Sequence, residues 1–282
     1  MATAAVASPR DVLTTLNYYA PIGTEAPYQY VYEAPPNIPQ NNLGSETHPV
    51  TIHDVRGRES EYTLDRNGFQ FVKHQSKETE FTDHGKIEKE YYPEVIELLK
   101  REVGAKRVFI FDHTIRKQTP DTSTPESEAK NARGPVERVH IDQTFDASTA
   151  RVHHHLGPEA SRLLKSRVRI INVWRPIGHP VAHKPLAVSD WRHLDTEHDL
   201  VPVRFIYPDR TGGIYNVKFN PDHKWHYLSS QAPDEVLLIK CFDSEVDRAR
   251  LTPHSAFLDE TSPKEAPQRE SIEVRCLVFD SE

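Results

Sequence analysis

The chain has 282 residues, a formal net charge of −7 at pH 7 and a pI near 6.1. A mildly acidic chain has no basic excess with which to neutralise phosphates, so nucleic acid is excluded as the main partner. No apolar run is long enough to span a bilayer, and the N-terminus lacks the basic flank and apolar core of a signal peptide. We therefore expect a cytoplasmic protein without a membrane partner.

The N-terminal 47 residues are rich in proline and tyrosine, and the prolines exclude a regular helix. Residues 1–47 are predicted to form an extended arm that lies across a single domain formed by residues 48–282. The tyrosines of the arm need a surface to pack on. That surface is either the chain's own core or an interface in a homodimer or in a heterodimer with a related subunit.

The segment after the arm changes character. A short hairpin is predicted within residues 50–64, because two short extended runs flank Arg56-Gly57-Arg58. Apolar residues then recur at spacings of three and four over residues 85–103, which predicts an amphipathic helix that ends at Gly104. Residues 107–115 have the composition of a strand. The helix is expected to support a sheet.

Residues 118–137 form a polar stretch that is rich in Pro, Ser and Thr and lacks periodicity. A long structureless segment inside a compact domain is usually functional or disordered. Because this one leads directly into His140, it is predicted to be an active-site lid. A second helix is predicted for residues 146–166, with a break at Gly157-Pro158.

Short strands with turn signals between them dominate the rest of the chain, and few helices separate them. Cys241 and Cys276 lie in two of these apolar runs and are expected to be free buried thiols, which fit a reducing compartment. The pattern predicts a mainly β protein, a β-sandwich or jelly roll with flanking helices. The predicted strands cover residues 168–174, 186–188, 203–207, 215–219, 225–228, 236–242, 255–258 and 272–279.

The stretch Arg138-Val-His-Ile-Asp-Gln-Thr144 is the centre of the functional prediction. If it is extended, His140 and Asp142 point to the same face, because strand side chains alternate with period two. An imidazole and a carboxylate on one face make two thirds of the 2-His-1-carboxylate triad that holds Fe(II). The third ligand should come from a later strand, and the candidates are His223, His226 and His254.

His254 stands at the start of an apolar strand, and Arg269 and Ser271 follow at the start of the last strong strand. Residues at i and i+2 share one face of a strand. A guanidinium beside a hydroxyl is suited to bind a carboxylate with two hydrogen bonds, as a dicarboxylate co-substrate would require at the end remote from a metal.

Five longer runs stand out between roughly residues 85 and 280. They are Ile170-Ile-Asn-Val-Trp-Arg-Pro-Ile177, Pro185-Leu-Ala187, Pro233-Asp-Glu-Val-Leu-Leu238, Pro253-His-Ser-Ala-Phe257 and Arg269-Glu-Ser-Ile-Glu-Val-Arg275. In these runs the chain resembles the fungal hydroxylase/desaturase family. That family includes proteins similar to the aspergillic acid hydroxylase and the gibberellin desaturases, and it is related to the cephamycin 7α-methoxylation proteins.

The resemblance implies a double-stranded β-helix that uses Fe(II), 2-oxoglutarate and O2 to hydroxylate, desaturate or cyclise a small secondary metabolite. It also implies metal ligation by His140, Asp142 and His254, and binding of 2-oxoglutarate by Arg269. His226 departs from the aromatic residue expected in relatives. Substrate contacts are predicted for the following residues: Arg175, Phe111, Trp225 and His226.

Two alternatives belong to another functional class. The same β architecture serves cupin-like binding proteins or isomerases, and auxiliary partner subunits that retain the fold without turnover. The presence of His140, Asp142, His254 and Arg269 together favours the enzyme, because a binding scaffold has no need for all four. Arg175 has an equally good alternative role in a structural salt bridge.

Overall fold

The computed structural model describes residues 9–117 and 134–282. In chain order these residues form β1 (Val12–Pro21), β2 (Tyr28–Tyr30), β3 (Leu43–Asp54), η1 (Glu59–Glu61), β4 (Phe69–Lys73), α1 (His84–Lys86), η2 (Ile87–Tyr91), α2 (Tyr92–Val103), β5 (Arg107–Lys117), β6 (His140–Ile141), α4 (Phe145–Leu156), η3 (Gly157–Glu159), α5 (Ala160–Leu163), β7 (Val168–Pro176), β8 (Leu186–Ser189), η4 (Trp191–His193), β9 (Leu200–Ile206), β10 (Thr211–Val217), β11 (Trp225–Tyr227), β12 (Glu235–Asp243), β13 (His254–Ala256) and β14 (Glu270–Phe279).

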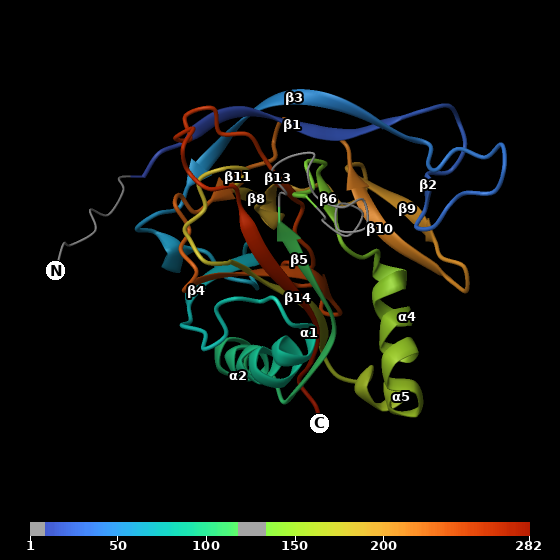
Figure 1. Ribbon diagram of the computed structural model, residues 1–282. Helices are drawn as coiled ribbons and strands as arrows, with labels where there is room; N and C mark the ends of the chain where they lie inside the picture. The colour runs from blue at the N-terminus through green and yellow to red at the C-terminus, as the bar shows by residue number, and fades with distance from the viewer. Residues whose placement is uncertain (1–8, 118–133) are drawn as a thin grey trace.

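The strands of the described part of the chain form two sheets, and Figure 1 shows their arrangement. The larger sheet has the strand order β1-β3-β11-β8-β13-β6-β10-β9-β2, and the smaller sheet has the order β4-β12-β7-β14-β5. Paired strands are antiparallel apart from β11 with β3 and β2 with β9. The mainly β architecture predicted from the sequence, a jelly roll of the double-stranded β-helix type, is confirmed.

The smaller sheet is covered on both faces, which explains why every residue of β7 and β12 is buried. One face of β7 carries Ile170 and Trp174 into the core between the sheets. The other face carries Ile171 and Val173 into a separate cluster with the helix residue Leu98. Side-chain direction along β7 therefore alternates between the interior of the barrel and the supporting helix.

The predicted helix at residues 85–103 is confirmed, although its first part is irregular. A single turn, α1, is followed by the π-helical η2 and then by the regular α2. Gly104 ends the helix in the left-handed conformation with φ 65°, which a glycine adopts without steric cost. Val95, Leu98 and Leu99 are buried against the smaller sheet, so the helix supports that sheet as expected.

The predicted N-terminal arm contains a regular strand. β1 pairs with β3 along its whole length, from Val12 opposite Ile52 to Pro21 opposite Leu43. The hairpin predicted within residues 50–64 is wrong, because β3 already pairs with β1 on one edge and with β11 on the other. The separation of the arm from the domain as a unit of its own stays a prediction.

Two further predictions concern the chain as a whole. Cys241 and Cys276 are free and buried, as expected. The predicted lid lies largely outside the described residues, which resume at Gly134. In the described part of the chain, no helix combines the length and apolar character that a membrane crossing requires.

A buried lysine ties β12 to the loops at one end of the barrel. Lys240 is fully buried and donates to Asp65 and Asp243, each at 2.7 Å, and to the carbonyl oxygen of Ala249 at 2.9 Å. All three ammonium protons are therefore used. Asp243 is also fully buried, and Arg167 donates to it from a second side.

We expect Lys240→Ala to lower the free energy of unfolding by about 3 kcal/mol, because removal of one partner leaves a buried charge with reduced compensation. Breaking a buried ion pair by removing one partner usually costs about 3–5 kcal/mol. Because Arg167 remains beside Asp243, we expect the lower end of that range. Urea unfolding followed by tryptophan fluorescence would measure the change. Arg248→Ala removes ion pairs at the surface, to Asp65, Glu245 and Asp247, and should cost less than about 1 kcal/mol. Equal effects of the two substitutions would contradict the role of Lys240.

Candidate metal centre

The pairing of two short strands brings the predicted metal ligands together. β6 and β13 are neighbours in the larger sheet, and their register places His254 directly opposite His140. The Nε2 atoms of His140 and His254 lie 3.4 Å and 3.8 Å from Oδ1 of Asp142. The donor atoms of these three residues all lie within 4.8 Å of one another, close enough to hold one ion.

Backbone carbonyls hold the other ring nitrogen of each histidine. Nδ1 of His140 lies 2.8 Å from the carbonyl oxygen of Arg138, and Nδ1 of His254 lies 3.0 Å from that of Thr252. Because a carbonyl oxygen only accepts, each Nδ1 carries a proton and donates it, which leaves a lone pair on each Nε2. Burial, with the neighbouring His140, lowers the pKa of His254 and favours the neutral form that binds metals.

The Asp142 carboxylate is oriented by two donors. Its Oδ2 accepts a hydrogen bond from Asn172 Nδ2 at 2.7 Å and another from Arg275 Nε at 3.0 Å. Burial alone would raise the pKa of Asp142, but the Arg275 guanidinium and the two histidines hold it well below its ordinary value. The carboxylate is therefore ionised, with Oδ1 directed toward the histidines.

This donor set fits the iron that the resemblance implies. Two neutral imidazole nitrogens and one ionised carboxylate oxygen converge from one side. Non-heme Fe(II) oxygenases use the same set, which leaves the remaining positions of the ion open for a co-substrate and oxygen.

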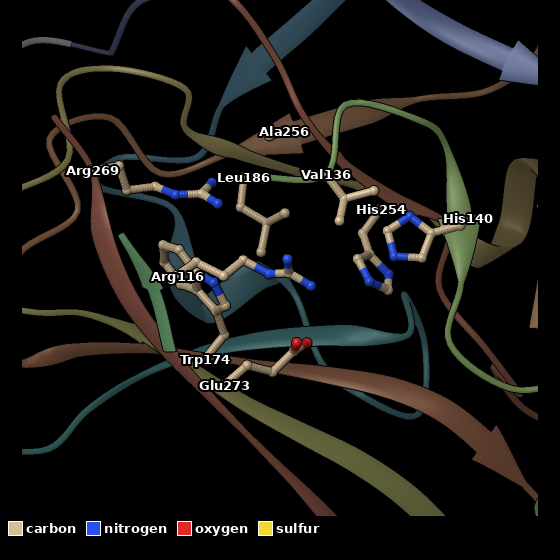
Figure 2. Close-up of a pocket in the computed structure, with 9 residues that line it drawn as sticks. All are labelled: Arg116, Val136, His140, Trp174, Leu186, His254, Ala256, Arg269 and Glu273. Carbon is tan, nitrogen blue, oxygen red and sulfur yellow. The ribbon is translucent and has the colours of Figure 1, made fainter. Parts of the chain in front are cut away.

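A pocket that is partly open to solvent extends from the two histidines. Figure 2 shows His140 and His254 at one end of this pocket and Arg269 at the other. Arg269 therefore faces the same space as the ligands while lying at a distance from them. The residues that line the pocket are Arg116, Val136, His140, Trp174, Leu186, His254, Ala256, Arg269 and Glu273.

Arg269 is only 3% exposed and has unused hydrogen-bonding capacity. One Nη donates to the carbonyl oxygen of Lys184 at 2.6 Å, and the guanidinium lies 5.6 Å from the centre of the Trp174 ring. Burial and the nearby charge of Arg116 lower the pKa of Arg269 to about 9. Its Nε and the Ser271 hydroxyl are both buried and have no partner among the described residues. A bound carboxylate would supply acceptors for such groups.

Two of the predicted substrate residues lie elsewhere. Arg175 points away from the pocket that Trp174 lines, because neighbouring residues of a strand face opposite sides. It donates to His74, with its guanidinium 5.1 Å from the Tyr91 ring centre. Among the described residues, the hydrogen-bond partner of Arg175 is this histidine and not a carboxylate.

Trp225 faces away from the metal ligands as well. It is 1% exposed, and its indole nitrogen donates to the hydroxyl of Tyr18 at 2.8 Å. Trp225 therefore packs against β1 and is not among the described residues that line this pocket.

The other two histidines considered as third ligand do not reach the site. His223 binds Asp199 at 2.9 Å. His226 is buried with its ring centre 4.9 Å from that of Tyr62 and 5.7 Å from that of Phe69, and burial lowers its pKa to about 4. Neither residue belongs to the described group of donor atoms around His140.

Phe111, another predicted substrate residue, packs against the core between the sheets. The Arg151 guanidinium lies 4.6 Å from its ring centre, and the His155 ring stacks on it at 5.3 Å. Arg151 also donates to Gln143, the residue that follows Asp142. Phe111 is therefore linked to the metal-binding segment through Arg151.

The sequence interpretation missed the residues that support the ligands: Asn172, Glu273 and, in this role, Arg275. A signal for two of them was present, because Ser271, Glu273 and Arg275 alternate with apolar residues along the last strand. In the structure, the apolar positions between them contribute to the helix-covered cluster. A row of polar residues on the inner face of a buried strand predicts a site along its whole length.

Comparisons with known proteins agree with this geometry. A family model described as an oxidoreductase/YMDC permease-like domain matches residues 16–279. The chain is 38% identical over 98% of its length to the hydroxylase/desaturase efuI of Hormonema carpetanum, of which it covers 97%. It is 36% identical over 91% of its length to the Fe(II)/2-oxoglutarate-dependent dioxygenase nvfI of Aspergillus novofumigatus, of which it covers 92%.

A solved structure, that of the iron and alpha-ketoglutarate-dependent endoperoxidase NvfI, matches with a TM-score of 0.84 and 33% identity. The match covers 96% of this chain and 99% of the other. The donor set, the fold and the relatives all point to the same class of enzyme. The chain belongs to the family of Fe(II)/2-oxoglutarate-dependent dioxygenases that includes the fungal hydroxylase/desaturases.

Proposed function

We propose that His140, Asp142 and His254 hold the iron of this oxygenase, and that Arg269 with Ser271 binds the far carboxylate of 2-oxoglutarate. The observation that carries the proposal is one pocket lined by both histidines at one end and by the under-used Arg269 guanidinium at the other. When bound, the iron supplies, with 2-oxoglutarate and O2, the oxidising power that removes hydrogen from a C–H bond.

The protein's own residues position the reactants in this proposal. Arg269 fixes the end of 2-oxoglutarate that does not react, which sets the distance of the other end from the histidines. Leu186, Val136 and Ala256 supply apolar walls of the pocket and limit the access of water. Trp174 packs near the Arg269 guanidinium and restricts its movement.

The proposed substrate is a medium-sized, partly apolar secondary metabolite. The relatives include enzymes named as hydroxylase/desaturases and an endoperoxidase, which act by oxidation. Phe111, with Arg151 over its ring, is the proposed apolar contact on the side of the Asp142 segment. Hydroxylation, desaturation and ring closure are all consistent with this site.

Succinate formation tests the proposal. The purified chain, supplied with Fe(II) and 2-oxoglutarate under air, should form succinate, and a mixture of candidate metabolites should yield a product with one added oxygen atom or two fewer hydrogens. The His254→Ala variant serves as the blank. If the wild-type chain formed no more succinate than this variant under any condition, the alternatives of an auxiliary subunit or a cupin-like binding protein would replace the enzyme.

We also propose that the chain works in the cytoplasm, which its two free buried thiols support. The expectation of a homodimer, or of a heterodimer with a related subunit, stays a prediction. Light scattering on the purified chain would test the homodimer, and co-purification with a related subunit would test the heterodimer.

A further inference from the structure

The Asp142 carboxylate is part of a closed ring of hydrogen bonds. Its Oδ2 accepts from Asn172 Nδ2 at 2.7 Å and from Arg275 Nε at 3.0 Å. The same Asn172 amide donates to Glu273 Oε1 at 2.8 Å, and an Nη of Arg275 donates to Glu273 Oε2 at 2.8 Å. Two donors therefore alternate with two carboxylates, and both protons of the Asn172 amide are used.

Further hydrogen bonds hold the Arg275 side chain of this ring in a fixed orientation. The other Nη of Arg275 donates to Asp112 at 3.1 Å and to the Thr114 hydroxyl at 2.9 Å, both on β5. Asn172 is fully buried on β7, and Glu273 is 7% exposed on β14. Three neighbouring strands of the smaller sheet thus fix the orientation of the carboxylate that directly follows β6 of the larger sheet.

This arrangement gives the two oxygens of Asp142 different tasks. Oδ2 is engaged by two donors, whereas Oδ1 faces Nε2 of His140 at 3.4 Å and Nε2 of His254 at 3.8 Å. A carboxylate that is free to rotate can bind a cation through both oxygens. Binding through both would occupy one more position of the ion and remove a position that the co-substrate or oxygen requires.

We propose that Arg275 and Asn172 are positioning residues that make Asp142 a ligand through one oxygen only, a role that rests on the proposed function of Asp142 as an iron ligand. Arg275 is therefore unsuited to bind 2-oxoglutarate, since its Nε and both Nη atoms already donate to carboxylates. These belong to Asp142, Asp112 and Glu273. The ring also holds two carboxylates against one guanidinium, and the remaining negative charge favours a cation beside Oδ1.

Titration of the metal-free full-length chain with Co(II), followed by absorption spectroscopy, tests the proposal without any turnover. Arg275→Lys keeps the charge but loses the planar fork that reaches both carboxylates. We expect this variant and Asn172→Ala to bind Co(II) about 10- to 100-fold more weakly than the wild-type chain, as loss of a ligand's supporting partner usually does. The d–d bands of bound Co(II) should also change, because they report its coordination number.

A matched control separates positioning from general destabilisation. Arg169 of β7 is a buried arginine, 3% exposed, and it pairs with Asp280 away from the ring. Arg169→Lys should lower the melting temperature but leave the Co(II) affinity and spectrum unchanged. If Arg275→Lys does not fold, Asn172→Ala decides the question alone.

The outcomes distinguish this inference from the proposed function. If His254→Ala weakened Co(II) binding while Arg275→Lys and Asn172→Ala left both affinity and spectrum unchanged, the positioning role would be overturned and the metal site would stand. If His254→Ala also bound Co(II) with wild-type affinity, the proposed metal site itself would fail, and this inference with it.

Discussion

Replacement of His254 by alanine is expected to lower Fe(II)-dependent succinate formation by more than about 100-fold while the chain stays folded. Partners of metal ligands alone usually contribute about 10- to 100-fold to metal affinity or activity, so the loss of one of three ligands should cost more. His254 stands opposite His140 in the sheet, and no other described histidine reaches this group of donors. Iron content and succinate formation would be measured on the same preparation.

His140→Ala should behave in the same way, but Asp142→Ala should not. Removal of the Asp142 carboxylate leaves the Arg275 guanidinium and the Asn172 amide buried without that acceptor. We therefore expect Asp142→Ala to lose stability as well as activity, by several kcal/mol if the guanidinium cannot reach water. The histidine variants are the cleaner test of the metal site.

His226→Ala is the matched control, because His226 is also a buried histidine on the larger sheet but packs among aromatic rings. It should retain bound iron and succinate formation. The assignment of the third ligand would be wrong if His226→Ala lost iron and His254→Ala kept it.

For two of the three proposed metal ligands, the shared strand face could be predicted from the sequence. For the third, the sequence left three histidines as candidates. His140 and Asp142 share a face through the period of an extended chain, which the sequence carries locally. The position of His254 depends on the register between β13 and β6, which are more than a hundred residues apart in the chain. Three histidines therefore remained as candidates until the family resemblance favoured one.

The sequence did not reveal, for a related reason, that Arg175 and Trp225 lie away from this pocket. Arg175 and Trp174 are neighbours in an entirely buried strand, so burial gave no indication of which one faces the pocket. Trp225 points to Tyr18, a partner 207 positions away along the chain. Faces of a strand that is covered on both sides can be assigned only when its neighbours are known.

The regular strand β1 in the N-terminal segment was not predicted, because the prolines of the whole segment were considered together. Residues 12–20 contain none, and Pro21 and Pro49 occupy a strand end and an interior position of β3 where the ladder still forms. Pro21 therefore stands at the end of β1, and Pro49 does not prevent the pairing of β1 with β3. The strands at residues 168–174, 236–242 and 272–279, by contrast, were found from their apolar content alone.

The Arg269→Ala variant is expected to raise the half-saturating concentration of 2-oxoglutarate by about 100-fold, with little change in iron affinity. Hydrogen bonds to charged groups contribute about 1.5–3 kcal/mol each, and about 1.4 kcal/mol corresponds to a factor of ten in binding. Arg269 is buried, its Nε lacks a partner among the described residues, and it lies at the far end of the pocket from the histidines. Succinate formation at increasing 2-oxoglutarate, at saturating Fe(II), would measure the shift.

Arg269→Lys and Arg116→Ala make this test specific. Lysine keeps the charge but cannot offer two parallel hydrogen bonds, so Arg269→Lys should restore only part of the affinity for 2-oxoglutarate. Arg116 lines the same pocket and also donates to the carbonyl oxygen of Gly134. If Arg269→Ala left the 2-oxoglutarate requirement unchanged and Arg116→Ala raised it, the binding role would belong to Arg116. If neither substitution changed the requirement, the far carboxylate would not be bound at this end of the pocket.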